Sequence, residues 1–149
     1  MIAPMPTLQP PVADLFTYGS LMCEDIMAAV AGASLVCTPA VLSGYCRFLV
    51  KNEQYPGVVA AAVGTVPGIV YHAITPEGWS RLDAFEGEFY DRSLVTVRYA
   101  HNTEAQVYCY VFRPEFHHLL TTIAWDYSAF LHSGKQLFQN RYCGFKTLD

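Results

Sequence analysis

The sequence predicts a single α+β domain, and length, composition and element order support this fold class. The chain has 149 residues, which suits one compact domain with a sizeable core. It is 52% hydrophobic and only 15% charged, which excludes wholesale disorder. The predicted elements follow the order β-α-β-β-β-β-α-β-β-α, which is typical of an α+β fold. We expect residues 1–12, with four prolines, to form a flexible tail and residues 13–149 to form the domain.

The first part of the domain is predicted to be a strand, a tight corner and a helix. Residues 13–18 are mostly apolar, as expected for a short buried strand, and Tyr18-Gly19-Ser20-Leu21 follows directly. Acidic residues at 24 and 25 favour a helix N-terminus there, and Gly32 can end that helix.

The middle of the chain contains four β-prone segments separated by glycine and proline. Tyr55-Pro56-Gly57 has the composition of a turn between the second and third of them. The expected strands lie at residues 36–42, 45–50, 58–63 and 69–74.

The best-defined helix begins after Thr75, which is a favourable N-cap, and ends at Gly87. The remaining elements are expected as an antiparallel pair at 89–99 and 105–112, and a helix from Asp126 onward that is interrupted at Gly134.

Charge and cysteine content exclude several classes of function. The net charge of -4, without a basic run, argues against a nucleic-acid partner. No apolar stretch approaches the ~20 residues of a membrane-spanning helix. The five cysteines are irregularly spaced and form no Cys-x-x-Cys pair, so we expect reduced thiols and no metal site. We find no secretory signal and therefore expect a cytoplasmic location.

The corner at Tyr18-Gly19-Ser20-Leu21 is a candidate anion-binding site. Glycine allows another molecule to approach the backbone closely. The first N–H groups of a helix have no partner within the helix and can bind a carboxylate or phosphate. Many such corners only connect two elements, so local chemistry leaves both interpretations open.

Glu86 is the unusual residue of the predicted helix. At about 100° per residue, it falls between Trp79 and Leu82, on the face expected to pack against the core. Burial raises the pKa of a carboxylic acid, which suits an acid–base catalyst near neutral pH. The alternative is a structural ion pair with Arg81 or Arg92.

Tyr90 and Arg92 lie two residues apart on the following strand and so share one face. If Glu86 points into a pocket near this strand, Tyr90 can donate a hydrogen bond and Arg92 can hold a carboxylate. The alternative is that Tyr90 packs in the core and Arg92 pairs with Glu88 or Asp91 at the surface.

Three motifs together resemble the AIG2-like branch of the γ-glutamylcyclotransferase-like family. In chain order they are Tyr18-Gly19-Ser20-Leu21, Tyr55-Pro56-Gly57 and Leu82-Asp83-x-Phe85-Glu86-Gly87-x-x-Tyr90-x-Arg92. Trp125-Asp126-Tyr127 is a weaker match. The resemblance covers roughly Asp14 to Phe130, and Cys23 is a local departure that lies outside the main motifs.

The resemblance implies a small mixed β-barrel with flanking helices and a cofactor-independent enzyme. It implies that Glu86 is the catalytic acid–base and that residues 18–21 form the substrate loop; we expect Tyr55, Tyr90 and Arg92 to contribute to substrate binding. The implied reaction is release of 5-oxoproline from a γ-glutamyl amine or peptide. The alternative is a module that binds a small acidic metabolite, or a different acyl transfer in the same pocket. The sequence leaves the leaving amine and the oligomeric state open.

Overall fold

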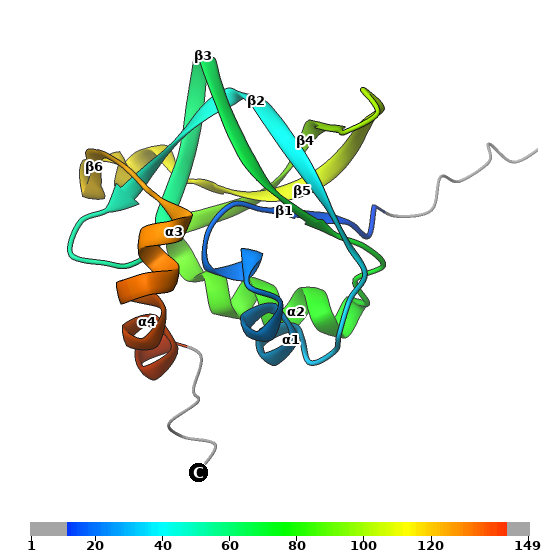
Figure 1. The fold of residues 1–149 in the computed structure, drawn as a ribbon, viewed down its shortest axis with the longest axis horizontal. Helices are drawn as coiled ribbons and strands as arrows, with labels where there is room; N and C mark the ends of the chain where they lie inside the picture. Colours follow the sequence, from blue (N-terminus) through cyan, green and yellow to red (C-terminus); the bar gives the residue numbers. More distant parts are fainter. Residues whose placement is uncertain (1–11, 143–149) are drawn as a thin grey trace, which may run out of the picture.

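The computed structural model describes residues 12–142, so residues 1–11 of the expected tail lie outside the described part. Six strands and four α-helices are described, together with short 3₁₀ and π turns (Figure 1). The elements are β1 (Leu15–Thr17), a 3₁₀ turn (Ser20–Met22), α1 (Glu24–Ala31), β2 (Cys37–Val50), β3 (Pro56–Tyr71), α2 (Pro76–Glu86), a 3₁₀ turn (Gly87–Phe89), β4 (Tyr90–Tyr99), β5 (Glu104–Phe112), a 3₁₀ helix (Pro114–Leu119), β6 (Leu120–Ala124), α3 (Tyr127–Ala129), a π turn (Phe130–Gly134) and α4 (Lys135–Tyr142).

Five of the strands close into a mixed β-barrel, as the resemblance implies. The strand order is β3-β1-β5-β4-β2-β6, and an additional pairing of β2 with β3 closes the ring. The β1–β5 pair is parallel, whereas the other pairs are antiparallel. Strand β6 pairs with β2 outside the closed ring. The expected α+β class and barrel are therefore confirmed.

The four short strands predicted in the middle of the chain are two long ones. Strands β2 and β3 pair continuously from Cys37↔Tyr71 to Leu49↔Pro56, with one register shift between Ser43 and Tyr45. Gly44, with φ of 86°, lies at that shift, so the glycine bends the strand and does not end it. The prediction was wrong because strongly bent barrel strands require glycine within the strand, where sequence patterns indicate a turn.

Tyr55-Pro56-Gly57 also differs from the expected turn. The turn lies just before it, at residues 51–54, and β3 begins at Pro56. This places the motif at a strand end beside the corner that follows β1.

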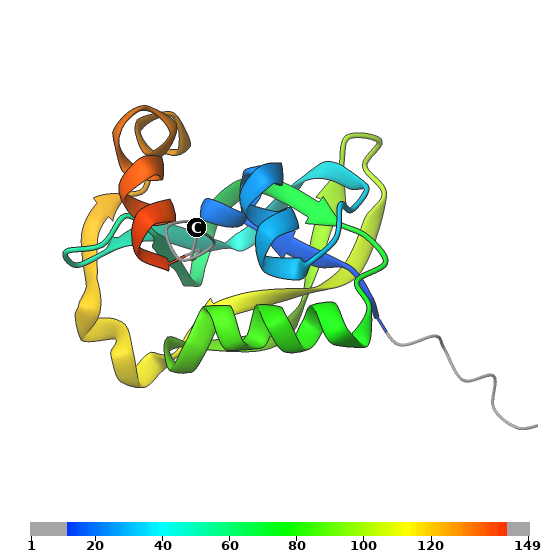
Figure 2. The ribbon, with the colours of Figure 1, turned by 90° about the horizontal axis from the view of Figure 1, so that it is seen from below.

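Helices α1 and α2 pack side by side against one side of the barrel, and α3 and α4 lie beside its other end (Figures 1 and 2). The Thr75 hydroxyl accepts a hydrogen bond from Gly78 N–H at 3.0 Å, which confirms the predicted N-cap of α2. Asp126 likewise caps α3. The expected interruption at Gly134 is a π turn through which the helical segment continues into α4. Sequence patterns did not predict β6.

The buried apolar residues form two clusters, one on each side of β1. Phe16 and Val58 belong to the barrel interior, whereas Leu15 and Ile26 pack between the barrel and the helices. Strand β1 is thus buried on both faces, and the corner that follows it begins inside the molecule. Within residues 12–142, no helix combines the length and the apolar character needed to cross a bilayer.

Candidate active site

The corner after β1 lines a cavity of about 330 Å³. A single 3₁₀ turn, Ser20–Met22, separates the corner from α1, which begins only at Glu24. Helix α1 therefore begins at the acidic residues where its N-terminus was expected. Among residues 12–142, the N–H groups of Gly19, Ser20 and Leu21 have no hydrogen-bond acceptor, as expected at the start of a helical turn. They are available to an anionic ligand.

Contacts with two other elements fix the corner. A Cβ atom on Gly19 would lie 2.7 Å from Cδ of Pro56, so only glycine permits this close approach of the loop to β3. Arg47 Nη1 donates a hydrogen bond to the Tyr18 carbonyl at 2.8 Å. The Arg47 guanidinium also lies 5.1 Å from the ring centroid of Trp125. The loop is thus held in one conformation before any ligand binds.

Glu86 is the last residue of α2, and its side chain lines the same cavity. Burial, together with the smaller effect of the nearby Asp83 charge, raises the pKa of the Glu86 carboxyl to about 8. At neutral pH, the protonated and ionised forms of Glu86 therefore lie close in free energy. This is the balance that a group needs in order to accept and return a proton.

The two structural partners considered for Glu86 are engaged elsewhere. Arg81 Nε donates to the Val30 carbonyl at 2.8 Å. Arg92 Nε lies 3.6 Å from Asp83 Oδ1, and its guanidinium stacks 4.4 Å from the Trp79 ring centroid. Within the described chain, no hydrogen bond or ion pair to the Glu86 carboxylate is present. The ion-pair alternative for Glu86 therefore does not apply to these residues.

The structure brings most of the predicted site residues together around this cavity. Those that line it are Tyr18, Gly19, Ser20, Leu21, Tyr55, Glu86 and Tyr90. Arg92 does not line the cavity, because its guanidinium pairs with Asp83 and lies over the rings of Trp79 and Tyr108. Arg92 and Tyr90 lie two residues apart on β4, but only Tyr90 reaches the cavity.

The two tyrosines nearest Glu86 use their hydroxyl groups to support the cavity wall. The Tyr18 hydroxyl donates to the Tyr110 carbonyl at 2.5 Å, and the Tyr90 hydroxyl donates to the Pro56 carbonyl at 2.8 Å. Burial raises the pKa of both phenols, so both remain neutral. Both rings therefore shape the cavity as rigid neutral walls.

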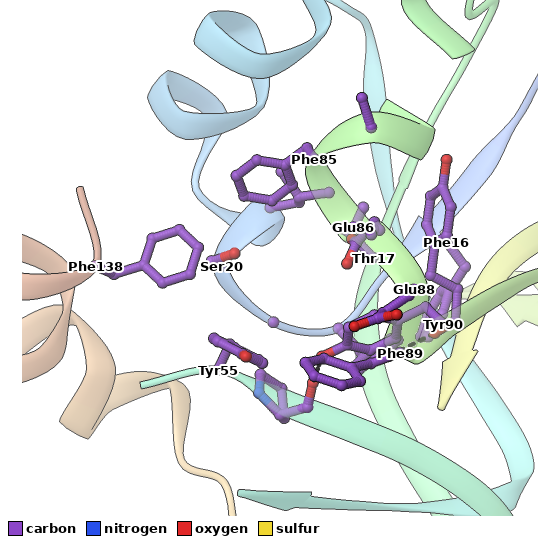
Figure 3. A pocket seen from close by; sticks show the side chains of 17 residues that line it. Phe16, Thr17, Ser20, Tyr55, Phe85, Glu86, Glu88, Phe89, Tyr90 and Phe138 are labelled. Atoms are coloured by element: carbon purple, nitrogen blue, oxygen red, sulfur yellow. Dashed lines mark hydrogen bonds between the residues drawn. The ribbon is translucent and has the colours of Figure 1, made fainter. Parts of the chain in front are cut away.

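Sequence reasoning missed several residues of the site. Phe85 and Phe138 line the cavity at the end away from Glu86 (Figure 3). Glu88 also lines it and is exposed to solvent, as expected. The Tyr110 hydroxyl donates to Asp83 Oδ1 at 2.6 Å, which positions the charge that acts on Glu86. Phe138 lies far away in the sequence, and no local pattern connects it with residues 18–21.

The cavity combines free N–H donors, a carboxyl group with a raised pKa and aromatic walls. Among residues 12–142, no three His, Cys, Asp or Glu side chains lie close enough to hold a metal ion. The arrangement can bind a small anionic group at the loop and exchange a proton with a neighbouring amine or oxygen. Fold and site together define a small mixed barrel with a cavity that contains a carboxyl group of raised pKa.

Comparison with known proteins identifies the family to which the chain belongs. A family model described as gamma-glutamyl cyclotransferase, AIG2-like, matches residues 15–127. The chain therefore belongs to the AIG2-like γ-glutamyl cyclotransferase family. It is 37% identical over 101 residues to AIG2-like protein C of Arabidopsis thaliana, covering 67% of this chain and 59% of the relative. It is 31% identical over 100 residues to Protein AIG2 C of the same plant, covering 67% of this chain and 61% of the relative.

The alignments thus span about three fifths of the length of these relatives. Among solved structures, the solution structure of an Arabidopsis thaliana protein has a TM-score of 0.67 at 26% identity, covering 92% of this chain and 84% of that one. A protein described as gamma-glutamyl cyclotransferase has a TM-score of 0.62 at 16% identity, covering 68% of this chain and 66% of that one. The second similarity supports the fold alone.

Proposed function

We propose that the protein is a γ-glutamylcyclotransferase that converts a γ-glutamyl amine or peptide into 5-oxoproline and the free amine. The observation that carries the proposal is the position of Glu86, a carboxyl group with a pKa of about 8 in the same cavity as the N–H groups of residues 19–21. Family membership supports the same reaction class.

The reaction suits a pocket that contains an acid–base group and no added nucleophile. The α-amino nitrogen of the substrate attacks its own γ-carbonyl carbon and closes a five-membered ring. The bond from that carbon to the leaving nitrogen breaks. The α-ammonium nitrogen loses two protons as it becomes the ring N–H, and the leaving nitrogen gains two protons as it departs as an ammonium group. Because the reaction is intramolecular, correct positioning supplies a large part of the rate enhancement.

In this mechanism, Glu86 accepts a proton from the α-ammonium group, whose ordinary pKa is about 8. It then returns a proton to the departing amine. The similar pKa values of donor and acceptor make transfer in both directions feasible. The N–H groups of Gly19, Ser20 and Leu21 bind an anionic oxygen of the substrate, either its carboxylate or the developing oxyanion.

The remaining walls orient the glutamyl half. Tyr18 and Tyr90 are neutral and held by hydrogen bonds to backbone carbonyls, so they confine the substrate without competing for its proton. Tyr55 forms part of the wall across the cavity from Phe85 (Figure 3). Arg92 forms an ion pair with Asp83, and the charge of Asp83 in turn helps to raise the pKa of Glu86.

The test measures 5-oxoproline by mass spectrometry after incubation with a panel of γ-glutamyl amines and peptides. Glu86→Gln is expected to lower kcat by at least about 100-fold, in line with the usual contribution of a general acid–base group. Glu77→Gln is the matched control, because Glu77 is an exposed carboxylate in the first turn of the same helix. Thermal unfolding checks that both variants are folded.

Full activity of Glu86→Gln would contradict the assigned role of the carboxyl group. Release of no 5-oxoproline from any member of the panel, together with tight binding of a small carboxylate, would instead favour a metabolite-binding module.

A further inference from the structure

The cavity has two chemically different ends. Glu86 and Tyr90 lie toward one end, and the rings of Tyr55, Phe85 and Phe138 surround the other, where Ser20 of the corner after β1 lies beside Phe138 (Figure 3). The ring centroid of Phe138 lies 6.2 Å from that of Tyr55 and 6.0 Å from that of Phe85, both in edge-to-face geometry. We refer to these three rings as the aromatic wall. A ligand that extends from Glu86 along the cavity therefore ends against an apolar surface.

Phe138 is a fixed part of this wall. Only 3% of its surface is exposed, and its ring packs against Phe130 with centroids 5.7 Å apart. Ion pairs hold the rest of α4 in place, from Lys135 to Asp25 at 3.0 Å and from Arg141 to Glu53 at 3.2 Å. The wall is thus formed before a ligand binds.

Phe138 lies outside the segment of the chain that contains Glu86 and the corner loop. Helix α4 begins at Lys135, beyond residues 15–127 matched by the family model. The acid–base group and the corner loop both lie within the matched segment. A residue outside that segment therefore contributes to the pocket, where it can affect which substrate binds without taking part in proton transfer.

The aromatic end of the cavity offers no cation to a second carboxylate. Among the described residues that line the cavity, none is Lys, Arg or His, and its two carboxyl groups, Glu86 and Glu88, lie away from Phe138 (Figure 3). The two cations of α4, Lys135 and Arg141, are engaged in ion pairs. A leaving group that carries its own carboxylate would lose water there without gaining a cationic partner, which is unfavourable. The departing amine itself leaves as a cation, which acidic neighbours tolerate.

Resting on the proposed cyclotransferase function, we propose that the aromatic wall is the subsite for the leaving amine. The preferred substrates are γ-glutamyl derivatives of amines that carry an uncharged aromatic or branched aliphatic group and no carboxylate. Phe138 is a residue that determines this specificity.

The experiment compares kcat/KM for three synthetic substrates. γ-Glutamylphenethylamide has a ring and no second carboxylate, γ-glutamylphenylalanine adds the carboxylate, and γ-glutamylmethylamide lacks the ring. The phenethylamide is expected to exceed each of the others by at least about tenfold, which corresponds to about 1.4 kcal/mol.

Variants then test the wall. Phe138→Ala is expected to lower kcat/KM for the phenethylamide by about tenfold or more, with a much smaller effect on the methylamide. Leu137→Ala is the matched control, because Leu137 lies on the same helix and is 59% exposed. Phe85→Leu removes a second ring of the aromatic wall, which belongs to α2. This variant tests the wall even if Phe138→Ala weakens the packing of α4.

Equal kcat/KM for the three substrates, or faster turnover of the phenylalanine derivative, would overturn the subsite. An equal loss for all substrates in both wall variants would do the same. In these cases, 5-oxoproline would still form and the cyclotransferase function would stand. Absence of 5-oxoproline from every substrate would overturn the function, and the subsite with it.

Discussion

The raised pKa of Glu86 has a consequence for stability that is independent of any substrate. In the unfolded chain this carboxyl group has an ordinary pKa near 4.5, whereas burial raises it to about 8 in the folded protein. Between these values the folded state binds more protons than the unfolded state. Ionisation of Glu86 therefore reduces stability as the pH rises from about 5 to about 8. Below pH 4.5 the carboxyl group is protonated in both states and has no such effect.

The size of the effect follows from the shift. At 1.36 kcal/mol per pKa unit, the change from 4.5 to about 8 corresponds to an upper limit of about 5 kcal/mol above pH 8. Relaxation of the cavity and entry of water around the ionised carboxylate reduce this value. Glu86→Gln replaces the acid with a neutral group of similar shape, so the variant avoids the loss.

The assay is urea unfolding of the wild type and Glu86→Gln at pH 5, 7 and 9, followed by tryptophan fluorescence. We expect similar stability at pH 5 and an advantage of at least about 2 kcal/mol for the variant at pH 9. Other titrating groups cancel in the difference between the two proteins. A difference that does not change with pH would refute a raised pKa at Glu86, and Glu77→Gln should show such a constant difference.

Three further predictions concern the supports of the site. Gly19→Ala would force the loop away from Pro56, because the added Cβ would clash with the proline ring. We expect kcat/KM to fall at least about tenfold and the free energy of unfolding in urea to fall by about 1–3 kcal/mol. Turnover at the wild-type rate would contradict the close contact. Asp83→Asn removes the charge that helps raise the pKa of Glu86, so the rise of kcat/KM with pH should move to lower pH, and an unchanged profile would count against this coupling. Thr75→Ala removes the N-cap of α2 and should reduce the free energy of unfolding by about 1 kcal/mol, with a proportional shift in the denaturation midpoint; no shift would mean that the cap contributes little.

Local signals predicted those parts of the fold whose cause is local. Thr75 begins α2 because its hydroxyl satisfies an N–H group of the first turn, and this depends on a few adjacent residues. The inward face of Glu86 followed from helical periodicity, which places residues seven apart on one side. The motifs around both regions then allowed the family, the barrel and several residues that line the cavity to be predicted.

Other features depended on contacts between distant segments. Glycine usually indicates a turn, yet Gly44 and Gly68 lie within long strands. Gly44 bends β2, and Gly68 allows β3 to approach its neighbouring strand closely, and closure of the barrel requires both. Arg92 shares a strand face with Tyr90, but Asp83 holds it outside the cavity. Neither outcome can be read from the spacing of residues along the chain.

The sequence by itself determined the family, the corner at residues 18–21 and the identity of the carboxyl group that faces inward, because these depend on motifs and short-range periodicity. Only the tertiary structure decided that the corner and Glu86 line one cavity, and that Phe85 and Phe138 form its other end. The physical reason is that barrel closure and the docking of α4 bring together residues 18–21, 85–86 and 138, which the chain separates widely. The corner loop is thereby part of a cavity that contains the Glu86 carboxyl group and ends in an apolar wall.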